Sequence, residues 1–310
     1  MSRLAHIALC ALLPLCAQAA PRQLDIVRPG GFLNVCAAPS GGGGGFWAGD
    51  DITSPIAGAC NAHYFAQGGP VSGTASSSAP SISNNAAGTA HMGWVQMGAE
   101  NHSPAETWFA HGTVNGGYSD TLTVNLAGHE GESGHLLLRV AVAGTMWATG
   151  ETGAAGFQVL PYVNKGMVSA ANPGYDDGSS NHLWSTDQQV ADWGVGSDAS
   201  DPDNSLAVNE VVTFSLPVVI GQGLEVGLYS RAIAGQRSSG GFPGWSANSG
   251  LAFTSFLAGG ASLVLSGQDA PGFSIASASG LDWTAAAVPE PGVWALMLAG
   301  LAVVALQRRR

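Results

Sequence analysis

Charged residues are scarce in this sequence, and basic residues are the scarcest. Only 10% of the 310 residues are charged, with 10 Lys or Arg against 21 Asp or Glu. Proteins that bind nucleic acid need a basic surface to neutralise phosphates. The formal net charge of −11 therefore excludes a nucleic-acid partner and argues against adhesion to anionic lipid. An acidic surface of this kind favours solubility and attracts divalent cations.

The common catalytic motifs are missing as well. The sequence has no Gly-x-Ser-x-Gly elbow, and the glycine run at 41–45 lacks the lysine of a phosphate-binding loop. His129 and His135 flank two glutamates, but they lie six positions apart, whereas zinc proteases need one helical turn. We expect a turn between two strands there and a protein that is not an enzyme. A glycoside hydrolase stays open as an alternative, because its two carboxylates need no local motif.

Long amphipathic helices are absent too, whereas glycine is abundant, with 45 residues. Instead, apolar residues alternate with polar ones, as in Leu122, Val124 and Leu126, a period typical of half-buried strands. We therefore predict an all-β fold for residues 20–287, an antiparallel β-sandwich of jelly-roll-like type. The expected strands cover 107–114, 118–126, 135–142, 157–163, 212–216, 224–228, 251–256, 261–265 and 273–278.

The N-terminal segment 1–19 has the features of a signal peptide. Arg3 precedes an apolar run from Ile7 to Ala17, and Ala17-Gln-Ala19 is a small-x-small cleavage site. We predict cleavage between Ala19 and Ala20. The mature body then holds six basic and twenty acidic residues, a net charge of −14.

Two cysteines remain after that cleavage, Cys36 and Cys60. An even pair in an oxidising compartment predicts a disulfide. The bridge would close a loop of about 25 residues and contribute roughly 3.5 kcal/mol by the loop-entropy estimate. Two separate buried thiols are the alternative.

Two segments of the body have compositions typical of loops. Residues 66–90 are rich in Ser, Ala, Gly and Asn, which predicts a long flexible loop. Residues 175–210 are rich in Asp and contain no Lys or Arg. Oxygen-rich loops bind Ca²⁺, so Asp198, Asp201 and Asp203 form a weak calcium candidate; no other metal or cofactor is expected. A plain solvated acidic loop is the alternative.

The same acidic segment contains three aromatic residues, Tyr175, Trp184 and Trp193. Aromatic rings beside carboxylates and amides stack on sugar rings and bond their hydroxyls, which makes glycan binding a second hypothesis. The alternative is that these side chains hold the loop against the core.

The last residues, 288–310, combine three parts. Val-Pro-Glu-Pro-Gly comes first, then an apolar run over 292–306, and finally a basic end with Arg308, Arg309 and Arg310. Fifteen residues make about 22 Å of helix, which is shorter than the roughly 30 Å hydrocarbon core of a bilayer. We predict a single short transmembrane helix over 292–306, with the arginines on the cytoplasmic side.

This tripartite tail resembles the PEP-CTERM sorting signal of Gram-negative bacteria. In that family a membrane enzyme, exosortase, recognises and processes exported proteins. The resemblance implies exosortase as a partner, and Pro289, Glu290 and Pro291 as the sorting motif. It also implies a transient stay in the inner membrane before the body reaches the cell surface or the extracellular matrix. The resemblance is confined to the tail.

Members of the PEP-CTERM family tend to accompany exopolysaccharide production, so exopolysaccharide is a further expected partner. A structural role at the surface or in a biofilm matrix is therefore our first hypothesis for function. A carbohydrate-binding module is the alternative, and a secreted glycoside hydrolase comes after it.

Overall fold

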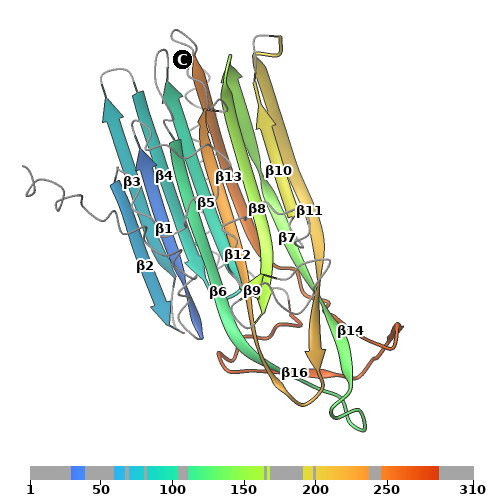
Figure 1. The fold of residues 1–310 in the computed structure, drawn as a ribbon. Coiled ribbons are helices and arrows are strands. Elements are labelled where there is room, and N and C mark those ends of the chain that lie inside the picture. The colour runs from blue at the N-terminus through green and yellow to red at the C-terminus, as the bar shows by residue number, and fades with distance from the viewer. Residues whose placement is uncertain are drawn as a thin grey trace, which may run out of the picture.

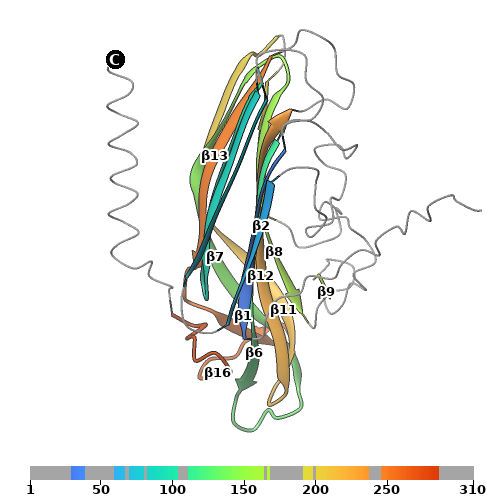
Figure 2. The same ribbon diagram turned by 90° about the vertical axis from the view of Figure 1, so that its left-hand side faces the viewer.

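The computed structural model describes residues 29–38, 59–66, 70–79, 82–103, 111–163, 166–167, 191–197, 200–236 and 246–285. Over these residues the chain is built from strands and turns, without helices. Figure 2 shows the strands edge-on as two layers, with β7 (Ser133–Gly150) and β13 (Ala247–Leu257) in one layer and β12 (Gly223–Gln236) in the other. In the part of the chain described here, there is accordingly no helix of the length and apolarity that crossing a membrane requires.

The strands run in chain order as follows: β1 Gly30–Ala38, β2 Ala59–Ala66, β3 Val71–Ala79, β4 Ile82–His91, β5 Trp94–Ser103, β6 His111–Asn125, β7 Ser133–Gly150, β8 Gly153–Val163, β9 Gly166–Met167, β10 Ala191–Gly196, β11 Asp203–Val219, β12 Gly223–Gln236, β13 Ala247–Leu257, β14 Ser262–Leu265, β15 Gln268–Asp269 and β16 Ser274–Ser277.

All strand pairs are antiparallel, and they form two sheets (Figure 1). Sheet A has the order β10-β8-β12-β6-β1-β2, with β16 beside the end of β6 and β9 beside β8. Sheet B has the order β15-β14-β7-β13-β5-β4-β3, and β11 pairs along the whole of β7. The predicted all-β fold with antiparallel sheets is therefore confirmed.

Connections that cross between the sheets give the sandwich its topology. β12 lies between β6 and β8 in sheet A, and β13 lies between β5 and β7 in sheet B. The consecutive strands β12 and β13 thus pair with two other consecutive pairs, β5–β6 and β7–β8. The assignment of this topology to a jelly roll stays a prediction.

The core fills the space between the two sheets because each strand turns alternate residues inward. In β7, Leu136, Leu138, Val140 and Val142 are all buried, whereas Arg139 on the other face is exposed. The apolar residues of the predicted alternation in β7 therefore face the core, as expected. The strand itself is longer than predicted, since 143–150 also pair with β13 and β11. This stretch is mostly Ala, Gly and Thr around Met146 and Trp147, and it lacks the regular apolar alternation of 136–142.

Residues 66–90 do not form the long loop that their composition predicts. β3 and β4 occupy most of the segment and pair with each other along their length. Small side chains pack inward at Ala75, Ala86 and Ala90, where they contribute to the core. Burial against β1 and β5 outweighs the weak strand propensity of these residues.

Candidate functional site: the anchored C-terminal end of the sandwich

A carboxylate without any solvent exposure lies in the middle of β6. Asp120 is 0% exposed and follows the inward phase of the strand, between Tyr118 and Leu122. Apolar residues occupy the neighbouring inward positions, so a charge here requires several hydrogen-bond donors. The sequence shows that Asp120 falls at an inward position between apolar residues. It does not show which residues donate hydrogen bonds to the carboxylate.

Five donors converge on Asp120. Its Oδ1 accepts hydrogen bonds from the backbone N–H groups of Thr121 at 2.8 Å and Ser279 at 2.9 Å. Its Oδ2 accepts from the hydroxyls of Ser277 and Ser279 and from the indole Nε1–H of Trp283 at 3.1 Å. Bonds to an ionised acceptor are stronger than bonds between neutral groups. This cluster, termed the Asp120 lock below, joins β6 to the C-terminal end of the body.

The segment that supplies these donors is packed as part of the fold. β16 pairs with β6, from Ser274 opposite Asn125 to Ser277 opposite Leu122. Trp283 is 1% exposed, and its ring lies 6.0 Å from that of Tyr118 at an angle of 52°. Such tilted aromatic pairs add to the burial of apolar surface. In Figure 1, β16 crosses the same end of the molecule as the turn between β6 and β7.

The last described residues are held by a further turn. Asp282 Oδ1 accepts from the N–H and hydroxyl of Thr284 and from the N–H of Ala285. These bonds, led by the Thr284 hydroxyl, hold the pKa of Asp282 below its ordinary value. The carbonyl of Thr284 also accepts from the N–H of Gly260 at 2.9 Å. Ala285, the last described residue of this turn, lies four residues before Pro289 in the sequence.

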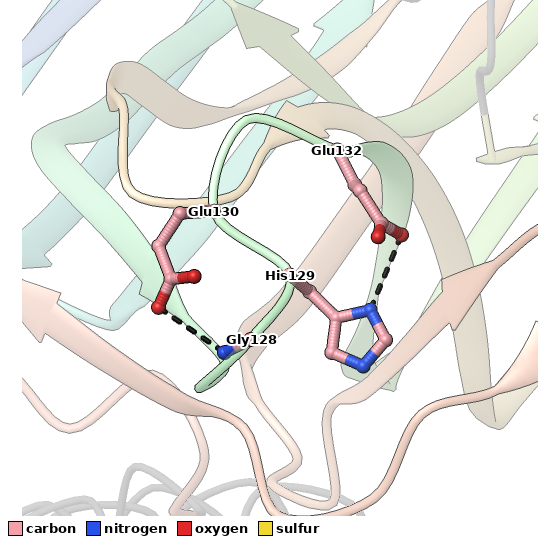
Figure 3. Close-up of polar contacts among 4 residues, drawn as sticks. All are labelled: Gly128, His129, Glu130 and Glu132. Atoms are coloured by element: carbon pink, nitrogen blue, oxygen red, sulfur yellow. Dashed lines mark hydrogen bonds and ion pairs between the residues drawn. The ribbon is translucent and has the colours of Figure 1, made fainter.

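His129 lies in a turn between two strands, as predicted for the segment that contains His129 and His135. β6 ends at Asn125 and β7 begins at Ser133. Figure 3 shows His129 Nδ1 beside Glu132 Oε2, 3.2 Å away, and Gly128 N–H donating to Glu130 Oε1 at 3.3 Å.

His135 lies outside this turn, on β7, where its Nδ1 is 3.1 Å from Ser215 Oγ. Gly128 and Gly131 have φ of 83° and 84°, a region that glycine adopts freely, so the loop is a tight turn and not a helix. Among the described residues, no group of three His, Cys, Asp or Glu is placed to hold a metal ion.

The acidic segment 175–210 is only partly a loop. β10 and the start of β11 lie within it, and both are paired, to β8 and β7 respectively. Of the calcium candidates, Asp201 and Asp203 are exposed, just before β11 and at its first residue respectively, and Asp198 lies outside the described residues. Trp193 is half-buried and stacks on Phe157 with ring centroids 6.2 Å apart, so it packs against the core. Tyr175 and Trp184 fall outside the described part of the chain.

Polar side chains form a row on the outer face of sheet A, buried except at Asp192 on the edge strand β10, which the sequence did not reveal. Asn34, Asn115, Arg231, Gln158 and Asp192 occupy neighbouring strands in register. Arg231 is 3% exposed, and its Nε and Nη1 make no hydrogen bond to the described residues. Asp192 is two strands away, and burial raises its pKa. Polar residues at outward positions of a strand are usually exposed to solvent. The sequence pattern therefore does not predict that the polar residues of this row are buried.

The two body cysteines face each other across one strand pair. In the β1–β2 register, Cys36 and Cys60 are direct Cα partners. Directly opposed residues in an antiparallel pair have Cα atoms about 4.5–5.5 Å apart, within the range of about 4.4–6.8 Å that a disulfide needs. The bridge itself stays a prediction. The signal peptide with its Ala19–Ala20 cleavage site, the sorting motif at 289–291, the helix at 292–306 and the terminal arginines all lie outside the described residues.

A comparison with protein families identifies the tail. The family described as "PEP-CTERM protein-sorting motif" matches residues 287–310. The match confirms the resemblance of the C-terminal residues, and it indicates an exported protein that is processed by exosortase. No curated protein matches the chain.

Comparison with solved structures adds no argument about fold or function. One similar chain comes from the structure of the infectious bursal disease virus Gx strain, at 11% identity and a TM-score of 0.14, covering 88% of this chain and 66% of that one. A mutant VP2 protein of the same virus is also 11% identical, with a TM-score of 0.09 over 63% of this chain and 48% of that one.

Proposed function

We propose that this exported, exosortase-sorted protein is a non-enzymatic structural component of the cell surface or of an exopolysaccharide matrix. The observation that carries the proposal is the PEP-CTERM motif at 287–310, which follows directly on an acidic, strand-rich body. A soluble folded body with a processed tail suits a component that is assembled outside the inner membrane.

The Asp120 lock supports delivery of a folded body. Every donor to the carboxylate lies upstream of Ala285, so cleavage at or near Pro289-Glu290-Pro291 leaves the lock complete. Four residues from Ala285 to Pro289 reach at most about 14 Å when fully extended. Exosortase must therefore act close to the folded sandwich.

The short tail suits a temporary anchor. An apolar run over 292–306 spans about 22 Å as a helix, and Pro289 and Pro291 interrupt any helix that would extend it toward the body. Arg308, Arg309 and Arg310 keep the end of the chain on the cytoplasmic side. Glu290 lies between the two prolines, where an enzyme at the membrane surface reaches it.

A non-enzymatic role is supported by the missing motifs and by the use of the buried carboxylate. Asp120 accepts five hydrogen bonds and has no exposed surface, so it is not available as an acid or base. Calcium at Asp198, Asp201 and Asp203 stays part of the proposal as a stabilising ion and not as a catalytic one.

The matrix role is tested by deleting the gene in its native, exosortase-positive host. We expect the body to be found in the extracellular matrix fraction of the parent strain. The deletion strain should form a mechanically weaker matrix, with unchanged extracellular glycoside hydrolase activity. An unchanged matrix, or a loss of hydrolase activity that the purified protein restores, would contradict the proposal.

A further inference from the structure

The outer face of sheet B contains a groove floored by very small side chains. Ala87 of β4 is opposite Gly98 of β5, and Gly98 is opposite Ala252 of β13. The groove has a volume of about 620 Å³ and reaches Thr74 and Ser76 on β3. It therefore runs across four neighbouring strands. A Cβ added at Gly98 would meet only the carbonyl of Leu251, at 3.5 Å, so the floor is open above this residue.

An exposed tryptophan borders this groove. Trp147 of β7 is opposite Gly250 of β13, which in turn is opposite Glu100 in the groove wall. A Cβ at Gly250 would lie 2.8 Å from Nε1 and Cε2 of Trp147, so the indole rests directly on this glycine. Trp147 is 38% exposed, and among the described residues Val211 is the other large apolar side chain with comparable exposure. The indole thus covers Gly250 and stays partly exposed to solvent.

Hydrogen-bonding groups surround the groove at the same level. Asn85 of β4 is directly opposite Glu100 of β5, and Ser76 of β3 is opposite Asn85. All three side chains are exposed. Carboxylate and amide oxygens accept hydrogen bonds, while amide and hydroxyl groups also donate. The row from Ser76 to Trp147 spans four strand spacings, or about 19 Å.

The combination fits a chain of neutral sugar rings. One face of a pyranose ring is apolar and stacks on an indole, while its edges carry hydroxyls that bond to carboxylate and amide groups. The floor of Ala and Gly leaves room for rings to lie flat. Polyanions are disfavoured, because Glu100 is the one charged residue among the described residues that line the groove, and the whole chain has a net charge of −11.

We propose that the outer face of sheet B binds a neutral polysaccharide, with one sugar ring on Trp147 and neighbouring rings along Glu100, Asn85 and Ser76. This inference uses the proposed matrix role only to say that the protein meets the polysaccharide outside the cell. The binding itself depends on residues of the described sandwich and not on the sorting tail.

The test is a calorimetric titration of the processed protein, recovered from exosortase-positive cells, with neutral gluco-, manno-, galacto- and xylo-hexasaccharides. Full-length protein in detergent is titrated in parallel, so that a failure of sorting does not affect the result. We expect at least one neutral hexasaccharide to bind and to change tryptophan fluorescence. A hexagalacturonate of the same length should bind at least about tenfold more weakly.

Variants on the same face locate the site. Trp147→Ala should weaken binding at least about tenfold, and Ala252→Phe should block it by filling the groove. Val211→Ala is the matched control, because it removes an exposed apolar side chain from β11 outside the groove and should leave affinity unchanged. Circular dichroism and the melting temperature of each variant show that the sandwich remains folded.

Three results would overturn the proposal: no neutral hexasaccharide binds, binding survives Trp147→Ala, or the anionic hexasaccharide binds better than all neutral ones. A second copy of the chain on this face would also overturn it. That outcome appears in sedimentation as a dimer that Trp147→Ala dissociates and that no sugar displaces.

Discussion

At the scale of single residues, Asp120 shows how one buried carboxylate can hold the C-terminal end of a folded body. Its two oxygens collect donors from β6 and from residues 277–283, and all of these groups lie within the fold. If the buried carboxylate loses its donors, its oxygens are left without hydrogen bonds in an apolar setting, which is costly. The same holds for the buried donors if the carboxylate is removed. The stabilisation therefore depends on the complete set.

Asp120→Ala is expected to lower the free energy of unfolding by about 3–5 kcal/mol, because it leaves the buried donors unsatisfied. Asp120→Asn should cost less, since the amide keeps one acceptor. Urea unfolding of the processed protein measures both changes. Asp282→Asn is the matched control, because its carboxylate is exposed and makes its hydrogen bonds to Thr284 and Ala285, not to the residues of the Asp120 lock. A stability of Asp120→Ala equal to that of the control would contradict the account.

Glu151 supplies a pH-dependent contact in the same structure. Its Oε2 accepts from the N–H of Ser246 at 2.7 Å and from the Ser246 hydroxyl at 3.0 Å. These bonds, the backbone one first, lower the pKa of Glu151 below its ordinary value. Stability from this contact is therefore present above the ordinary pKa of the carboxyl and is lost as the pH falls through the folded-state value.

Glu151→Gln should consequently lower the melting temperature at about pH 7 and leave it unchanged at about pH 2, where both proteins carry a neutral side chain. Thermal unfolding across this pH range measures the difference. An equal loss at both pH values would mean that packing, and not the charge, is responsible.

At the scale of elements, the sequence was most informative where apolar alternation is strong. Leu122 and Val124 in β6 and Leu136 to Val142 in β7 predicted both the strands and the faces they bury. The sequence did not predict β3 and β4, because many of their inward side chains are alanines, which give only a weak apolar signal. The serines, glycines and asparagines around them are typical of loops. Only pairing with β1 and β5 turns these residues into strands, and pairing at long range leaves no local pattern.

The site was predictable to a smaller extent than the fold. The sorting motif is contiguous, so the sequence alone identified it and the family match confirmed it. The Asp120 lock joins residues 157 to 163 positions apart. The groove beside Trp147 needs the register of four strands before its residues can be placed together. Both were therefore inaccessible to reasoning from local patterns.

β16 and the turn after it are expected to behave as part of the sandwich and not as a linker. A chain ending at Ala285 keeps the lock and should unfold at the same temperature as the processed protein. A chain ending at Ala270 removes β16 and Trp283, exposes Tyr118 and leaves Asp120 without most of its donors. We expect it to lose about 3–5 kcal/mol of stability and to be cleaved rapidly in limited proteolysis. Equal protease resistance of the two chains would contradict this view.

At the scale of the whole molecule, the chain divides into a C-terminal sorting tail and a folded body. The tail at 288–310 is too short for a comfortable permanent span, and its prolines separate it from the body. The last described residue of the sandwich, Ala285, lies three residues before this tail. The outer groove on sheet B belongs to the folded body, so it remains after the tail is processed.

The central claim is that Pro289-Glu290-Pro291 directs processing of an exported body. Glu290→Ala tests it most directly in an exosortase-positive cell, with Glu210→Ala on β11 as the control for losing an exposed acidic residue. The parent chain and the control should be found in the extracellular fraction without the tail. Glu290→Ala should stay in the membrane fraction at the mass of the chain that has lost only its signal peptide. Release of Glu290→Ala at the shorter mass would contradict the account.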